Sequence, residues 1–141
     1  CYSVNPHPRN VPEDVQRKLA ENGGVQMITA VPGFVSAKVH GWDVNGGTGT
    51  RPEATVQEVA DHVEAARDVM GVDHVGVGGD YDGTDAMPVG MRNVGEYQNL
   101  FDELRSRGWS EDDLNKLGWC NVLRVLEVND RAYAAFMSAG E

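Results

Sequence analysis

The sequence predicts an α/β fold in which two strands lie parallel and helices cover them. An apolar segment at residues 25–31 has the pattern of a strand, and a β-rich segment follows at residues 74–79. Between them lies a helical pattern with its own start and stop signals. A helix that connects two strands in this way is typical of a parallel sheet.

A helix is expected ahead of the first strand, over residues 11–22. A proline and two acids at its start suit the first turn of a helix. Val15 and Leu19 give it an apolar face, and a pair of glycines ends it. Residues 25–31 are mostly apolar, which predicts a strand buried on both faces.

Residues 37–54 are rich in glycine and are predicted to form a loop. The connecting helix begins at Thr55, because Thr55 and Glu58 have the spacing of a capping box. Gly71 ends this helix before the second strand. The apolar positions on one of its faces are Val56, Val59, Ala60, Val63 and Met70.

Two further helical segments, near residues 93–107 and 111–137, give the chain a helical C-terminus. Only about two strands are evident. At 141 residues the chain has the length of one ordinary domain.

Composition excludes several classes of function. A formal net charge of −10 argues against nucleic acid and anionic membrane surfaces as partners. No apolar run approaches the roughly 20 residues of a transmembrane helix. Cys1 and Cys120 are expected to be free thiols in a reducing, cytoplasmic compartment of bacterial type. Because the first residue is not Met, we expect a processed chain or a piece of a longer product.

The run at residues 74–90 is the most informative part of the chain. Its strand ends in two glycines, and three acids follow: Asp80, Asp82 and Asp85. An acid at the carboxyl end of a parallel strand is well placed to meet a ligand. The alternative is a solvated turn whose acids cap backbone N–H groups.

The histidines do not form a recognisable metal motif. None has the spacing of His-x-His, His-Glu-x-x-His or a Cys/His site. His62 lies beside acids on a helix flank and is expected to be solvated. His74 precedes the second strand, at the end opposite the expected site. His7, close to Arg9, is the best functional candidate among them.

Two segments together resemble the membrane (renal) dipeptidase family, zinc-dependent enzymes that cleave dipeptides. They are residues 7–15, HPRNVPEDV, and residues 76–83, GVGGDYDG. The similarity spans nearly all of residues 2–126 in the family's order. Its other parts lie at residues 21–25, 32–36, 59–63, 67–74 and 121–126.

The resemblance implies that residues 1–141 are the C-terminal portion of one (β/α)8 TIM barrel of the metal-dependent-hydrolase type. The chain would then carry the last two barrel strands. It also implies a dipeptide substrate, two zinc ions and a possible homodimer of the full-length enzyme. The family's zinc ligands would all precede Cys1, so we expect no metal ligand in this chain and no activity from the chain alone.

Two family roles fall on residues of this sequence. The resemblance implies that Arg9 binds the C-terminal carboxylate of the substrate, which suits the planar guanidinium fork. It implies that Asp80 binds the amino end of the substrate and assists proton transfer as the catalytic acid or base. The alternative for Arg9 is a surface salt bridge with Asp14 or Glu13. Asp82 is the second candidate for an active-site acid, although a capping role suits it better.

Two other interpretations remain open. The chain could be a non-catalytic, truncated barrel module that acts in binding or assembly. It could also come from an unrelated TIM-barrel enzyme acting on sugars or phosphates, which the lack of a clear phosphate-binding loop disfavours.

Overall fold

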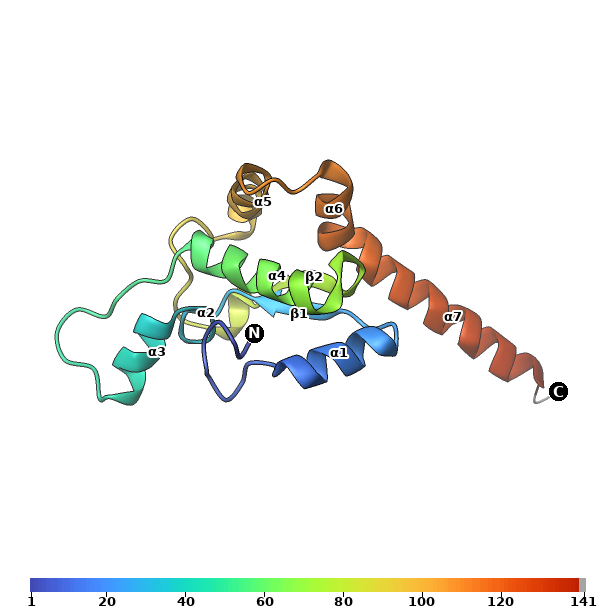
Figure 1. Ribbon diagram of the computed structural model, residues 1–141, viewed down its shortest axis with the longest axis horizontal. Coiled ribbons are helices and arrows are strands. Elements are labelled where there is room, and N and C mark those ends of the chain that lie inside the picture. The colour runs from blue at the N-terminus through green and yellow to red at the C-terminus, as the bar shows by residue number, and fades with distance from the viewer. Residues whose placement is uncertain (140–141) are drawn as a thin grey trace.

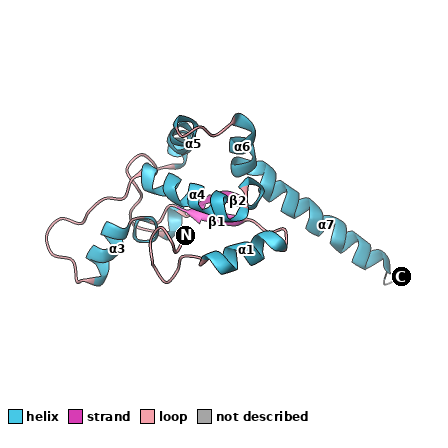
Figure 2. Cartoon of the chain, in the orientation of Figure 1, coloured by secondary structure: helices cyan, strands magenta, loops and turns pink. Residues whose placement is uncertain are grey.

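The computed structural model describes residues 1–139, in which two parallel strands lie among seven α-helices (Figure 1). Strand β1 spans Gln26–Thr29 and β2 spans Val75–Gly79. Figure 2 shows both strands at the centre of the molecule. Gln26 pairs with Val75 at one end of the sheet, and Thr29 pairs with Gly79 at the other. The predicted parallel strands are therefore confirmed.

Helix α4 (Val56–Met70) makes the connection between the strands and packs on both of them. The predicted capping box is confirmed. Thr55 Oγ1 accepts a hydrogen bond from the Glu58 backbone N–H, and the Thr55 N–H donates to Glu58 Oε2 at 2.9 Å. The predicted apolar face is buried at every position: Val56, Val59, Ala60, Val63 and Met70.

Strand β1 differs from the prediction because only one of its faces is buried. Gln26 and Ile28 face the core, whereas Met27 is 41 % exposed. Met27 lies over Gly76 of β2, where a Cβ would come within 2.6 Å of its sulfur. In the described part of the chain, the core cluster lies on the opposite face of this sheet.

Helix α1 (Glu13–Glu21) contacts α4, but not through the predicted stripe. Val15 is 46 % exposed, and Gln16 is the residue of α1 that is buried. Gln16 Nε2 donates to Gln26 Oε1 at 2.8 Å, which satisfies its amide nitrogen inside the protein. The apolar pattern of α1 was too weak to reveal this polar contact.

The prediction of a loop over residues 37–54 is wrong for its first part. Helix α2 (Pro32–Val35) follows β1, and α3 (Ala37–Val44) follows directly. Ser36 begins α3, because its Oγ accepts a hydrogen bond from the Val39 N–H. This N-cap outweighs the glycine inside α3.

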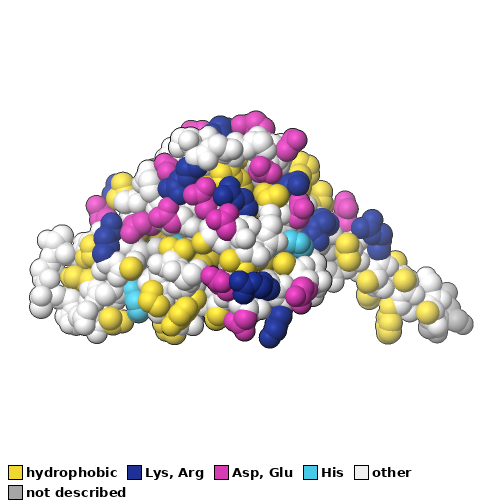
Figure 3. Space-filling model, in the orientation of Figure 1, with side chains coloured by type: hydrophobic (Ala, Val, Ile, Leu, Met, Phe, Trp, Pro, Cys, Tyr) yellow, Lys and Arg dark blue, Asp and Glu magenta, His cyan; other side chains and the backbone are white. Residues whose placement is uncertain are grey.

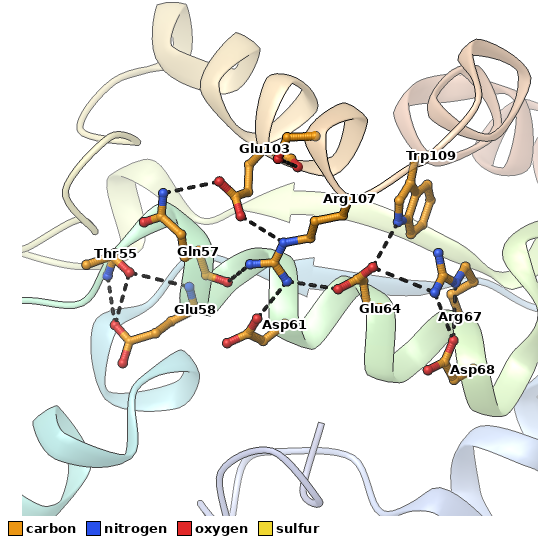
Figure 4. Close-up of polar contacts among 11 residues, drawn as sticks. Thr55, Gln57, Glu58, Asp61, Glu64, Arg67, Asp68, Glu103, Arg107 and Trp109 are labelled. Atoms are coloured by element: carbon orange, nitrogen blue, oxygen red, sulfur yellow. Dashed lines mark hydrogen bonds and ion pairs between the residues drawn. The ribbon is translucent and has the colours of Figure 1, made fainter.

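The predicted helical segments after β2 are confirmed. Helix α5 spans Tyr97–Ser106, α6 spans Glu111–Asn115, and a π-helical turn at Lys116–Cys120 leads into α7, Asn121–Ala139. Short 3-10 turns lie at Val72–His74, Tyr81–Gly83 and Val94–Glu96. Arg107, just after α5, ties that helix to α4 (Figure 4). It bonds Asp61 at 2.7 Å, Glu64 at 2.8 Å and Glu103 at 2.8 Å.

Helix α7 projects from the body of the molecule (Figure 1). Leu126 of this helix is 57 % exposed. Figure 3 shows apolar side chains along the projecting part of this helix. Among residues 1–139, no helix is both long enough and apolar enough to cross a membrane.

Candidate functional site

The candidate site lies at the carboxyl edge of the two strands. The Ala30 N–H donates to Gly79 O at 2.9 Å, so β1 and β2 end side by side. Asp80 follows β2 directly. The expected placement of Asp80, at the carboxyl end of a parallel strand that adjoins the first, is confirmed.

The backbone holds Asp80 in the left-handed conformation, with φ 69° and ψ 38°. Within residues 1–139 it is the only residue other than glycine with a positive φ. Aspartate tolerates this region better than most residues, but it remains an unusual conformation. The Asp80 N–H donates to Gly78 O at 2.7 Å, and the Gly83 N–H donates to Asp80 O at 3.2 Å. The turn thus fixes the backbone of Asp80 at the strand end and leaves its side chain exposed.

Two glycines make room for this turn. A Cβ on Gly79 would lie 2.9 Å from Cε2 of Tyr81 and still closer to the hydroxyl of Tyr97. A Cβ on Gly83 would lie 2.8 Å from Cγ of Asp80 and closer again to its Oδ1. The carboxylate of Asp80 therefore rests against the bare Cα of Gly83.

The other acids of the run lie in the open. Asp82 is exposed in the turn Tyr81–Gly83, and Asp85 is also exposed. The capping role expected for Asp82 is not found, since among the described residues no backbone N–H donates to its carboxylate.

Arg9 lies in the segment before α1, with its guanidinium over the ring of Phe34. Its Cζ is 5.3 Å from the ring centroid. The alternative of a salt bridge with Asp14 or Glu13 is wrong. Glu13 pairs with Arg17 at 2.9 Å, and among residues 1–139 no carboxylate lies within ion-pair distance of Arg9. Its edge N–H donors are free to bind an anion.

One pocket connects Arg9 to the strand ends. It has a volume of about 130 Å³, and its wall includes Arg9, Thr29 and Phe34. Thr29 is also the residue of β1 that pairs with Gly79, next to Asp80. Arg9 therefore lines a pocket that reaches the end of β1, beside the end of β2 that Asp80 follows, although Asp80 itself does not line this pocket.

His7 lies beside Arg9, as the sequence suggested. Its ring centroid is 4.6 Å from that of Phe34 and 4.6 Å from that of His40. The Arg9 N–H donates to His7 Nδ1 at 3.0 Å, which requires that nitrogen to be unprotonated. Burial, together with the nearby charges of His40 and Arg9, lowers the pKa of His7.

His62 is not solvated, contrary to the prediction, but buried with 1 % exposure. Its Nδ1 lies 2.6 Å from the backbone nitrogen of Cys1. Burial is the main cause that lowers the pKa of His62 to about 4. Its spacing from Val59 and Ala66 could have revealed this, because residues three and four apart share a helix face.

The side chains of this chain do not fit a metal centre by themselves. Within residues 1–139 there is no group of three or more His, Cys, Asp or Glu side chains that could hold a metal ion. His74 lies before β2, away from Asp80, with its Nδ1 2.9 Å from Gly24 O. His7 and His40 lie together, but no third ligand joins them among the residues that the structure describes.

Known proteins are similar to this chain in sequence. The family model of membrane dipeptidases (peptidase family M19) matches residues 1–137. The chain is 38 % identical over 126 residues to dipeptidase aclJ of Aspergillus oryzae, covering 89 % of this chain and 27 % of that protein. It is 35 % identical over 141 residues to dipeptidase verJ of Clonostachys rogersoniana, covering 100 % and 33 %. The chain thus spans a third or less of these curated relatives.

Solved structures agree with the sequence matches. A metallopeptidase from Rhodobacter sphaeroides, liganded with a phosphinate mimic of the dipeptide L-Ala-D-Ala, has a TM-score of 0.76 at 27 % identity. The match covers 89 % of this chain and 33 % of that one. An amidohydrolase from Pseudomonas aeruginosa, at 24 % identity and a TM-score of 0.71, shows likeness of fold alone, covering 89 % and 42 %. By its sequence, the chain belongs to the membrane dipeptidase family, peptidase family M19.

Proposed function

We propose that this chain is the C-terminal, substrate-binding portion of a metal-dependent dipeptidase with a (β/α)8 barrel. In this proposal β1 and β2 are the last two strands of the barrel, and strands outside this chain complete it. Family membership and the share of each relative that the chain spans support the proposal. The exposed face of β1 around Met27 is consistent with a barrel in which side chains of further strands cover this face.

One observation carries the proposed function. Among the described residues, Arg9 has no carboxylate partner, and its pocket reaches the end of the sheet at which the exposed carboxylate of Asp80 lies. A dipeptide has an ammonium at one end and a carboxylate at the other. The site therefore offers one group of opposite charge to each end of the substrate.

The two residues would do different work. The planar fork of Arg9 would donate two parallel hydrogen bonds to the C-terminal carboxylate of the dipeptide, both before and during the reaction. Asp80 would accept a hydrogen bond from the substrate's ammonium, take up the proton that the attacking water loses, and pass this proton to the nitrogen of the amine that leaves. The left-handed turn would hold the Asp80 carboxylate in place for both tasks.

Ligands outside this chain would hold the metal at this site. The family resemblance implies two zinc ions, which would polarise the scissile carbonyl and supply the attacking hydroxide. Because the residues described do not form a metal group, this chain's part in the reaction would be to bind and orient the dipeptide. We expect no zinc-stimulated dipeptidase activity from the 141 residues alone.

A second candidate is a non-catalytic module that associates with another chain, including a second copy of itself. The apolar side chains exposed on α7, among them Leu126, Tyr133 and Phe136, favour association. Wild-type steady-state activity in the dipeptidase that contains this chain, abolished by a chelator and restored by zinc, would support the enzyme. A complete protein that hydrolyses no dipeptide in the presence of zinc would contradict it.

The sharpest test of the proposed site uses two substrates. With a simple dipeptide, Arg9→Ala should raise KM by about 10- to 100-fold, the value of a charge-assisted hydrogen-bonded pair. Arg9→Lys should recover only part of this loss. With the C-terminal amide of the same dipeptide, Arg9→Ala should change KM little. Arg17→Ala, which removes an exposed arginine of α1, is the matched control. An unchanged KM in Arg9→Ala would remove Arg9 from the site.

A further inference from the structure

Phe34, in helix α2, contacts two side chains of the segment before α1 that can carry a positive charge. Arg9 Cζ is 5.3 Å from its ring centroid, and the His7 ring centroid is 4.6 Å away at an interplanar angle of 44°. Phe34 also lines the pocket that Arg9 shares with Thr29. Its ring is therefore a wall of the candidate site and the surface on which Arg9 rests.

The backbone around Arg9 is tied to the same helix. Asn10 Nδ2 donates to Phe34 O at 2.7 Å. Asn5, which is fully buried, donates from its Nδ2 to Gly33 O at 3.0 Å and to Phe34 O at 3.0 Å. These bonds lie on both sides of Arg9 along the chain. They hold its Cα at a constant position relative to the ring, so only the long side chain remains to be oriented.

An arginine that lies over an aromatic ring suits an anion-binding site better than one that is paired with a carboxylate. The ring attracts the flat face of the guanidinium, whereas the N–H donors project from its edge. A salt bridge would occupy those donors, but the aromatic contact leaves them free. The contact also restricts a side chain that would otherwise lose its rotamer freedom when the ligand binds.

We propose that Phe34 is a positioning residue, which holds the guanidinium of Arg9 ready for the carboxylate of the substrate. Phe34 acts through Arg9 and takes no part in bond breaking. The inference rests on the proposed function of Arg9, and it predicts an effect on the binding of the carboxylate alone.

The test is a double-mutant cycle in the dipeptidase that contains this chain. Phe34→Leu should raise KM for a free dipeptide by about two- to fivefold, the value of an exposed cation–π contact, and should leave kcat unchanged. Phe34→Trp should keep the wild-type KM, because indole is the best partner for a cation. In the Arg9→Ala background, Phe34→Leu should add nothing. With the C-terminal amide of the dipeptide, it should have no effect.

A matched control separates positioning from packing. Phe101→Leu is the same substitution at another half-buried phenylalanine, which contacts Gly118 and not Arg9. It should not change KM. If Phe34→Leu raises KM equally with and without Arg9, or equally for the amide, the inference is overturned while the role of Arg9 stands. If Arg9→Ala itself leaves KM unchanged, the proposed function fails first.

Discussion

Replacing Gly83 with alanine should misplace the Asp80 carboxylate without touching its chemistry. The new Cβ would lie 2.8 Å from Asp80 Cγ, whereas ordinary van der Waals contact begins at 3.4 Å. Cγ must therefore move by about 0.6 Å, and Oδ1, which lies closer, must move further. A displacement of roughly 1 Å in a catalytic group can cost on the order of 10²-fold in rate. We expect a fall in kcat of that order for a simple dipeptide.

The measurement is steady-state kinetics on the complete dipeptidase that we propose contains this chain, with thermal melting as a check on folding. The φ of Gly83 is not positive, so alanine should not strain the backbone there. Gly41→Ala is the matched control, because a Cβ at Gly41 would meet nothing within 4 Å. If Gly83→Ala keeps the wild-type kcat while its Tm is also unchanged, the orientation of Asp80 by this turn has no catalytic importance.

Two further predictions concern stability and association. The pKa of His62 is about 4 in the folded protein and near 6.5 in the unfolded chain. Its contribution to the free energy of unfolding is therefore complete above pH 6.5 and is lost as the pH falls toward 4. The free energy of unfolding should fall by up to about 3 kcal/mol over this range. Urea unfolding at one protein concentration should show this fall in the wild type and in the control His74→Gln, and a clearly smaller fall in His62→Gln. Equal falls in all three proteins would refute the prediction. The isolated 141 residues should self-associate through exposed apolar surface, and lysine at Leu126 and Phe136 should reduce this in sedimentation; a cooperatively melting wild-type monomer would contradict the prediction.

Local signals predicted the scaffold of the site well. The Thr55 capping box and the apolar face of α4 identified the connecting helix, and hence the parallel strands that place Asp80 at their carboxyl edge. Signals that depend on tertiary contacts were missed. The burial of His62 and the contact of Arg9 with Phe34 depend on segments that are distant in the sequence and meet only in the folded protein. The local sequence suggested a solvated side chain for His62 and, as the alternative to a substrate-binding role, a surface salt bridge for Arg9.

The shortness of the chain explains another difference. A parallel strand within a complete sheet is buried on both faces, and residues 25–31 have that composition. In the described residues only two strands are present, so Met27 is left exposed. The apolar pattern of β1 therefore fits the larger sheet that we propose better than it fits these residues alone.

The most direct test of the account is a comparison of kcat and KM between Asp80→Asn and Arg9→Ala. Asparagine keeps the shape of Asp80 but cannot transfer the proton, so kcat should fall by on the order of 10²-fold or more. Arg9→Ala should act mainly on KM, because the carboxylate anchor forms in the ground state and the transition state alike. Wild-type turnover in Asp80→Asn would contradict the account.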